Sequence, residues 1–165
     1  MIVRPEQLGD ADAIRAVTAA AFAGARVSSG TEAAIVDALR DAGALTLSLV
    51  AEAKGRVIGH IAFSPVAIDG APLGWFGLGP VAVAPERQGR GVGAALIEEG
   101  LARLRADRAG GCVLLGDPGY YARFGFASDP ALRYADAPAR YFQRLAFCDV
   151  VPCGEVAFHP AFDAG

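Results

Sequence analysis

A glycine-rich segment in the middle of the chain carries the clearest chemical pattern. It follows a run of apolar residues and precedes a long stretch with helical periodicity. Glycines lack a Cβ, so successive backbone N–H groups can turn toward one anion. The first turn of a helix adds N–H groups that have no intrahelical acceptor. The segment therefore predicts a phosphate or pyrophosphate site at Gly89, Gly91 and Gly93, with side-chain donors available from Arg87, Gln88 and Arg90.

Two well-known phosphate-binding patterns fit this segment less well. A Walker P-loop requires Gly-Lys followed by Ser or Thr, and the chain contains no such tripeptide. A dinucleotide fingerprint is matched formally by Gly89-x-Gly91-x-x-Ala94, which leaves an NAD(P)-binding oxidoreductase as an alternative. In that fold the first glycine directly follows its strand, whereas residues 85–88 intervene here. Too little chain follows the segment to form a second nucleotide-binding half.

A third pattern, Gln/Arg-x-x-Gly-x-Gly/Ala, is present from Gln88 to Gly93. Together with the preceding Val81-x-Val83-x-Pro85, it resembles motif A of the GNAT N-acetyltransferase superfamily. The segment Tyr120 to Phe126, Tyr-Tyr-Ala-Arg-Phe-Gly-Phe, is similar to the aromatic-Tyr-x-x-x-Gly-Phe segment of the same family. Because both motifs occur at the family's separation and on the matching elements, the resemblance extends over most of the chain.

The resemblance implies an enzyme that transfers the acetyl group of acetyl-CoA directly to a primary amine. By position in the family, the backbone of Val81, Ala82 and Val83 would bind pantetheine, and Gln88–Gly93 would bind the pyrophosphate. Tyr121 falls on the position of the acid that protonates the departing thiolate. A phenol with a pKa near 10 stays protonated at neutral pH and can serve as a general acid. A non-catalytic acetyl-CoA-binding module is the alternative from another class, although cofactor binding alone does not require this phenol.

The resemblance leaves the general base and the acceptor open. Glu32 and His159 fall in segments that line acceptor sites in the family, and a chain of water molecules is the third possibility. Asp117 precedes Pro118, which is typical of a helix cap. The acceptor is a small molecule or a peptide amine, and the protein is a monomer or a homodimer.

Apolar periodicity and turn residues predict the elements that position these residues. One helix is expected to begin after Asp10 or Asp12, either of which can cap it. Further helices are expected over residues 31–42, 91–107, a short stretch from 118, and 137–147. The expected strands cover residues 2–3, 45–53, 56–68, 75–84, 112–115 and 154–158, and residues 22–30 form a loop. The order predicts a mixed α+β domain spanning residues 1–165, with a central, largely antiparallel sheet and helices on both faces. The resemblance implies that this is the GNAT-type acyl-CoA N-acyltransferase fold.

Composition argues against several other classes of protein. The 165 residues are 53% hydrophobic and 20% charged, as expected of a globular domain. A net charge of −3 argues against general nucleic-acid binding or attachment to an anionic membrane. The three cysteines and two histidines give no zinc-ligand spacing, so no metal is expected. The chain has no signal-peptide pattern and no membrane-length apolar stretch, so we expect a cytoplasmic protein.

Overall fold

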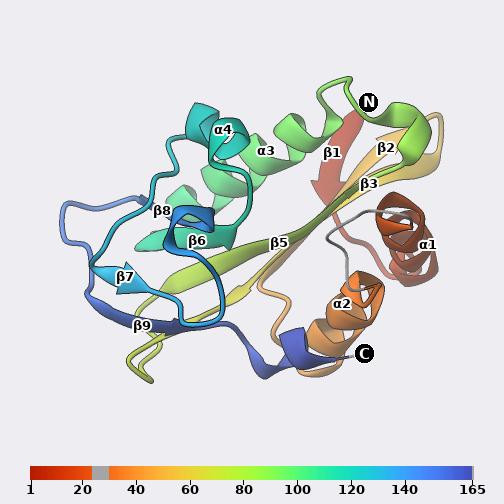
Figure 1. The fold of residues 1–165 in the computed structure, drawn as a ribbon. Helices are drawn as coiled ribbons and strands as arrows, with labels where there is room; N and C mark the ends of the chain where they lie inside the picture. Colours follow the sequence, from red (N-terminus) through yellow and green to blue (C-terminus); the bar gives the residue numbers. More distant parts are fainter. Residues whose placement is uncertain (24–29, 165) are drawn as a thin grey trace. The chain divides into compact units, whose positions relative to one another are not determined.

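The computed structural model of the protein describes residues 1–23 and 30–164 (Figure 1). The expected loop at 22–30 lies mostly outside these residues. The chain divides into two compact units. The first contains Met1–Phe63, Gly79–Leu101 and Pro160–Gly165, and the second contains Ser64–Leu78 and Ala102–His159. Three elements contribute residues to both units: β3 (Arg56–Pro65), β5 (Trp75–Val83) and α3 (Val92–Ala106).

The first unit combines antiparallel strands with the two N-terminal helices. Strand β2 (Leu47–Ala53) pairs antiparallel with β1 (Ile2–Pro5) on one side and with β3 on the other. Lys54 (φ 52°) and Gly55 (φ 74°) link β2 to β3 in the left-handed conformations that a two-residue hairpin turn needs, so the predicted hairpin is confirmed. The elements of this unit are β1 (Ile2–Pro5), α1 (Ala11–Phe22), α2 (Glu32–Asp41), β2 (Leu47–Ala53) and parts of β3 (Arg56–Pro65), β5 (Trp75–Val83) and α3 (Val92–Ala106).

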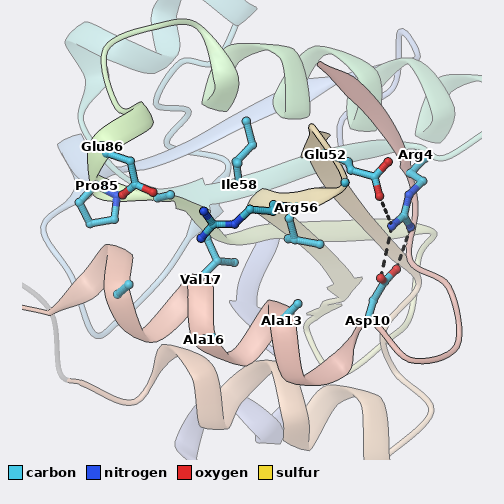
Figure 2. A pocket seen from close by; sticks show the side chains of 14 residues that line it. Arg4, Asp10, Ala13, Ala16, Val17, Glu52, Arg56, Ile58, Pro85 and Glu86 are labelled. Atoms are coloured by element: carbon cyan, nitrogen blue, oxygen red, sulfur yellow. Dashed lines mark hydrogen bonds and ion pairs between the residues drawn. The ribbon is translucent and has the colours of Figure 1, made fainter.

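Helices cover both faces of the strands in the first unit. Side chains alternate between the two faces of β3. A Cβ on Gly59 would contact α3, and the ring of Phe63 lies against Gly100 of the same helix. On the opposite face, Val50 packs with Ile14 of α1 and with α2 in a buried cluster. Helices α1 and α2 lie side by side, and Figure 2 shows α1 and α3 on opposite sides of the strands.

The second unit contains a parallel strand pair and a small separate sheet. Strand β5 pairs in parallel with β6 (Gly111–Leu115), and β6 pairs antiparallel with β8 (Phe142–Ala146). The small sheet has the order β4 (Ala67–Ile68), β9 (Gly154–Ala157), β7 (Leu132–Arg133). The hydrophobic core of the second unit includes Trp75, Val113, Phe142, Leu132 and Val156. The short helix α4 (Pro118–Tyr121) follows β6.

Two local predictions were wrong. Residues 137–147 do not form one helix, because only Ala139–Tyr141 make a short 3-10 turn and β8 occupies 142–146. The spacing of Phe142 and Leu145 imitates one face of a helix, but both faces of this strand carry buried side chains, so no alternation shows in the sequence. Asp10 stands at the N-cap of α1, but its carboxylate accepts hydrogen bonds from Arg4 and the Gln7 backbone and none from the helix. Among the described helices, none is long and apolar enough to cross a membrane.

Candidate functional site

The glycine-rich loop follows β5 and leads into α3, as the sequence predicts, and it lies in the first unit. Gly89 (φ 74°) and Gly91 (φ 83°) have left-handed backbone conformations, which favour glycine. A Cβ on either residue would have no other atom within 4 Å, so the space beside the loop is open. A ligand can therefore approach the backbone closely at these two positions.

The start of α3 supplies the hydrogen-bond donors of this loop. The Gly91 carbonyl accepts from the Ala95 N–H at 3.0 Å, so the helix begins directly after Gly91. The N–H groups of Val92, Gly93 and Ala94 consequently have no intrahelical acceptor and carry the positive end of the helix dipole. The side chain of Val92 is buried and anchors the helix end, whereas Arg90 is exposed. This arrangement fits a pyrophosphate.

Gln88 makes a contact within the protein that the sequence does not reveal. Its Nε2 donates to the Val83 carbonyl at 3.1 Å, and its backbone N–H donates to the Pro85 carbonyl at 3.4 Å. These bonds tie the loop to the end of β5. Gln88 is thus engaged in shaping the loop, and one N–H of its side-chain amide is left for a ligand.

On the side of β5 that pairs with β6, the pairing ends well before the last third of the strand. The parallel pairing of β5 with β6 covers Trp75–Gly77. Val81, Ala82 and Val83 lie beyond this paired stretch. Ala82 is buried, and Val81 and Val83 are half-buried.

Tyr121 belongs to the second unit and is the last residue of α4. Asp117 caps this helix as predicted, because its Oδ1 accepts from the Gly119 N–H at 2.9 Å. The ring of Tyr121 meets the rings of Tyr120 and Phe126 edge-on, with centroid separations of 5.0 and 6.0 Å. The packing therefore fixes the orientation of the ring.

The surroundings of Tyr121 raise the pKa of its phenol. Burial raises the pKa of Tyr121 to about 12, with smaller contributions from Tyr120 and Cys112. The phenol is accordingly protonated throughout the neutral range. Burial also raises the pKa of the Cys112 thiol, so this cysteine is a poor nucleophile.

The two candidate bases belong to different units. Glu32 is the first residue of α2 in the first unit, and His159 is the last residue of the second unit. Both side chains are half-buried. Among the described residues, no three His, Cys, Asp or Glu side chains are grouped so that they could hold a metal ion.

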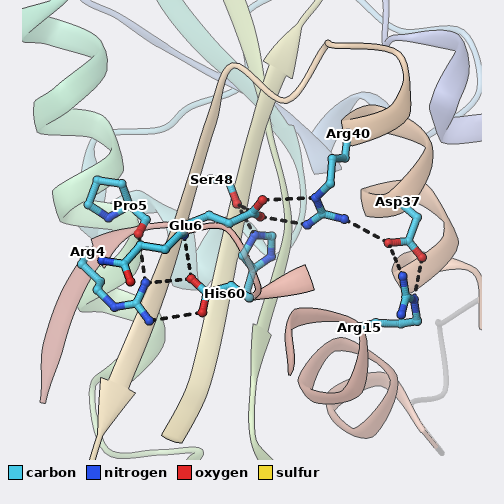
Figure 3. Close-up of polar contacts among 10 residues, drawn as sticks. Arg4, Pro5, Glu6, Arg15, Asp37, Arg40, Ser48 and His60 are labelled. Carbon is cyan, nitrogen blue, oxygen red and sulfur yellow. Dashed lines mark hydrogen bonds and ion pairs between the residues drawn. The ribbon is translucent and has the colours of Figure 1, made fainter. Parts of the chain in front are cut away.

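A buried polar network in the first unit was missed by the sequence analysis (Figure 3). His60 is fully buried, and its Nε2 lies 2.7 Å from the Ser48 hydroxyl, which donates to Glu6 at 2.8 Å. Arg40 donates to Glu6 and to Asp37, which continues the network to α2. Burial lowers the pKa of His60 to about 4, so the ring is neutral at pH 7. A single histidine in an apolar strand is too weak a signal to reveal this network.

The first unit also has a cavity of about 500 Å³ between α1 and the end of the β2–β3 hairpin (Figure 2). Three of its charged side chains are joined by ion pairs, because Arg4 pairs with Asp10 at 2.7 Å and with Glu52 at 3.1 Å. The cavity wall includes Pro85 and Glu86 but none of the glycine-rich loop. The cavity is therefore separate from the predicted pyrophosphate site.

Comparisons with known proteins agree with the two motifs. The family model described as an acetyltransferase (GNAT) domain matches residues 45–128. The uncharacterized N-acetyltransferase YhbS of Escherichia coli K12 is 42% identical over 127 residues, which are 76% of this chain and 73% of that protein. The family match covers both motifs.

Two solved structures are similar along nearly the whole chain. A GNAT family acetyltransferase from Brucella melitensis, in complex with acetyl-CoA, is 57% identical with a TM-score of 0.89, over 98% of this chain and 97% of that chain. YhbS from Escherichia coli, in complex with CoA, is 37% identical with a TM-score of 0.90, over 98% and 91%. The predicted α+β fold is thus confirmed, and the chain belongs to the GNAT family of N-acetyltransferases.

Proposed function

We propose that this protein binds acetyl-CoA at the glycine-rich loop and transfers the acetyl group directly to a primary amine. The observation that carries this proposal is the pair of left-handed glycines, Gly89 and Gly91, at the N-terminus of α3. Their open surroundings leave room for a pyrophosphate against backbone N–H groups. The similar Brucella melitensis and Escherichia coli proteins, which were solved with acetyl-CoA and CoA, support the same assignment.

The loop and the end of β5 divide the binding of acetyl-CoA between them. Gln88, Gly89, Arg90, Gly91, Val92 and Gly93 hold the pyrophosphate, chiefly through backbone N–H groups and the helix dipole. Backbone groups of Val81, Ala82 and Val83 pair with the amides of pantetheine. Because most of these donors belong to the backbone, a chain with a net charge of −3 can still bind a polyanionic substrate.

The reaction requires one proton to leave the amine and one to reach the sulfur. The amine nitrogen forms a bond to the thioester carbonyl carbon, and the carbon–sulfur bond breaks as CoA departs. A backbone N–H of β5 stabilises the negative charge that develops on the carbonyl oxygen. Tyr121 donates a hydrogen bond from its phenol to the departing sulfur. The thiolate takes up its proton either from this phenol, which is then reprotonated from solvent, or from solvent directly.

The raised pKa of Tyr121 refines this role. A phenol with a pKa of about 12 is a weaker acid than a thiol, whose pKa is about 8.5 in a model peptide. Tyr121 therefore acts mainly by donating a hydrogen bond to the sulfur as negative charge develops there. Hydrogen bonds to charged groups contribute about 1.5–3 kcal/mol, or roughly 10- to 150-fold in rate. The rate has no alkaline limb from this phenol below about pH 11.

Glu32, His159 or a water chain accepts the proton of the amine, and the acceptor is a small molecule or a peptide amine. The three free cysteines support a location in a reducing compartment such as the cytoplasm. Strands β3 and β5 and helix α3 run through both compact units, which supports one acetyltransferase domain over residues 1–165. A monomer and a homodimer both accommodate this reaction.

Replacing Tyr121 by Phe tests the function, because Phe keeps the ring and removes the hydroxyl. We expect the single-turnover rate to fall at least tenfold, and by as much as 10⁴-fold if proton transfer is complete. The affinity for acetyl-CoA should change by no more than one hydrogen bond, about 0.5–1.5 kcal/mol. Release of CoA is followed by liquid chromatography with spermidine, L-lysine, kanamycin or an alanyl peptide as the amine.

Tyr120→Phe is the matched control, because Tyr120 precedes Tyr121 in the same short helix. It should keep the wild-type rate. A wild-type rate in Tyr121→Phe would refute the acid role. Binding of acetyl-CoA without release of CoA in the presence of any of the amines would instead favour the non-catalytic module. Thermal protection by NAD(P) and not by acetyl-CoA would favour the oxidoreductase.

A further inference from the structure

Gln143 is a buried polar residue whose hydrogen bonding is incomplete. It lies in β8 with 1% of its surface exposed. Its Nε2 donates to the Gly116 carbonyl at 3.1 Å, and its Oε1 has no partner among the described residues. A buried acceptor without a donor destabilises a fold, so each such atom calls for an explanation. A residue of the same size without polar atoms would fill this position at lower cost to stability.

The contact of Gln143 falls where β6 ends and α4 begins. The Gly116 N–H donates to the Tyr141 carbonyl at 3.0 Å, and the Gly116 carbonyl accepts from Gln143. The backbone N–H and the backbone carbonyl of Gly116 are therefore both held by residues in or next to β8. The next residue, Asp117, caps α4.

The same glycine supports the ring of Tyr121. A Cβ on Gly116 would lie 2.5 Å from the Cε2 atom of Tyr121, so the ring rests directly on the glycine backbone. The rings of Tyr120 and Phe126 close on it edge-on. A shift of Gly116 would consequently move the Tyr121 ring or open a gap beneath it.

We propose that Gln143 is a positioning residue for Tyr121, which it orients by holding the Gly116 carbonyl. This inference rests on the proposed acid role of Tyr121. A displacement of about 1 Å at a reacting group can cost 10²-fold in rate, so the position of this ring matters more for turnover than for folding. The unpaired Oε1 is retained because the other half of the same amide fixes Gly116.

The inference predicts opposite effects on activity and stability. Gln143→Met keeps the length of the side chain and removes both polar atoms. We expect the single-turnover rate to fall at least tenfold and the KM for acetyl-CoA to change less than twofold, with Tm unchanged or higher. Thr18→Val is the matched control, because Thr18 is fully buried and its hydroxyl also has no partner among the described residues. It should leave the rate unchanged.

A second variant adds a pH signature that a purely structural role would not produce. In Gln143→Glu, the protonated carboxyl can donate to the Gly116 carbonyl, whereas the carboxylate cannot. Burial raises the pKa of such a carboxyl, so this variant should lose activity as pH rises through that raised pKa. Wild type and Gln143→Met should show no such loss. This variant also keeps the inference testable if Gln143→Met does not fold.

The double variant Tyr121→Phe/Gln143→Met separates this inference from the proposed function. If Gln143 acts through Tyr121, the double variant should be no slower than Tyr121→Phe alone. A full rate in Gln143→Met beside a slow Tyr121→Phe would overturn the positioning role and leave the acid role intact. Losses that multiply in the double variant would also overturn it. A full rate in Tyr121→Phe would overturn the acid role, and the positioning role with it.

Discussion

Replacing Gly91 by Asp should damage acetyl-CoA binding far more than it damages the fold. Gly91 has a φ of 83°, and a Cβ at this position would have no other atom within 4 Å. The stability cost therefore comes from the backbone conformation alone. A left-handed conformation costs an L residue about 1–2 kcal/mol, and Asp and Asn tolerate it best. We expect the variant to fold, with a loss of about 1 kcal/mol in the free energy of unfolding.

The binding cost comes from charge. At an effective dielectric constant of about 20, two like charges roughly 5 Å apart repel by about 3 kcal/mol. Salt screening at the exposed loop reduces this value. The affinity for acetyl-CoA should consequently fall at least tenfold, or about 1.4 kcal/mol. Gly91→Asn has nearly the same shape without the charge, so its affinity should fall less.

Calorimetric titration with acetyl-CoA and urea unfolding measure the two effects separately. Gly55→Asp is the matched control, because Gly55 has a φ of 74° and equally open surroundings in the β2–β3 turn. It should lose comparable stability and keep its affinity. The pyrophosphate assignment fails if Gly91→Asp binds acetyl-CoA normally, or if Gly55→Asp weakens binding as much.

Two further predictions concern stability. Gly100→Ala should destabilise the protein by about 1–3 kcal/mol in urea unfolding, because a Cβ at this position collides with the ring of Phe63. A free energy of unfolding within about 0.5 kcal/mol of wild type would contradict this packing. Burial lowers the pKa of His60 to about 4, so on acidification the unfolded chain protonates this imidazole before the folded protein does. The free energy of unfolding should therefore fall by up to about 3 kcal/mol as pH drops from about 6.5 to 4. Glu6 adds a loss of the same sign below its ordinary pKa of 4.5, because hydrogen bonds from Arg40 and Ser48 outweigh its burial and lower its pKa. His60→Gln should flatten the pH slope of the urea midpoint above pH 4.5, and an unchanged slope would assign it to other groups.

Much of the fold follows from local patterns in the sequence. The Lys54-Gly55 turn, the glycines before α3 and the Asp117-Pro118 start of α4 each depend on the conformational preferences of neighbouring residues. Such preferences act within a few residues, so they are visible without tertiary contacts. For the same reason the glycine-rich loop could be predicted from the sequence, whereas Tyr121 was proposed from its place in the family motif.

The features that the sequence did not reveal depend on distant partners. Residues 142–146 form a strand because β6 pairs with them, although their spacing favours a helix. Burial by surrounding elements sets the pKa values of Tyr121 and His60. Gln143 meets Gly116, which is 27 residues away in the chain. The sequence by itself thus determined the turns, the helix starts and the glycine-rich loop. Tertiary contacts decided how the side chains are oriented and charged, because hydrogen bonding and burial act between segments that no local pattern connects.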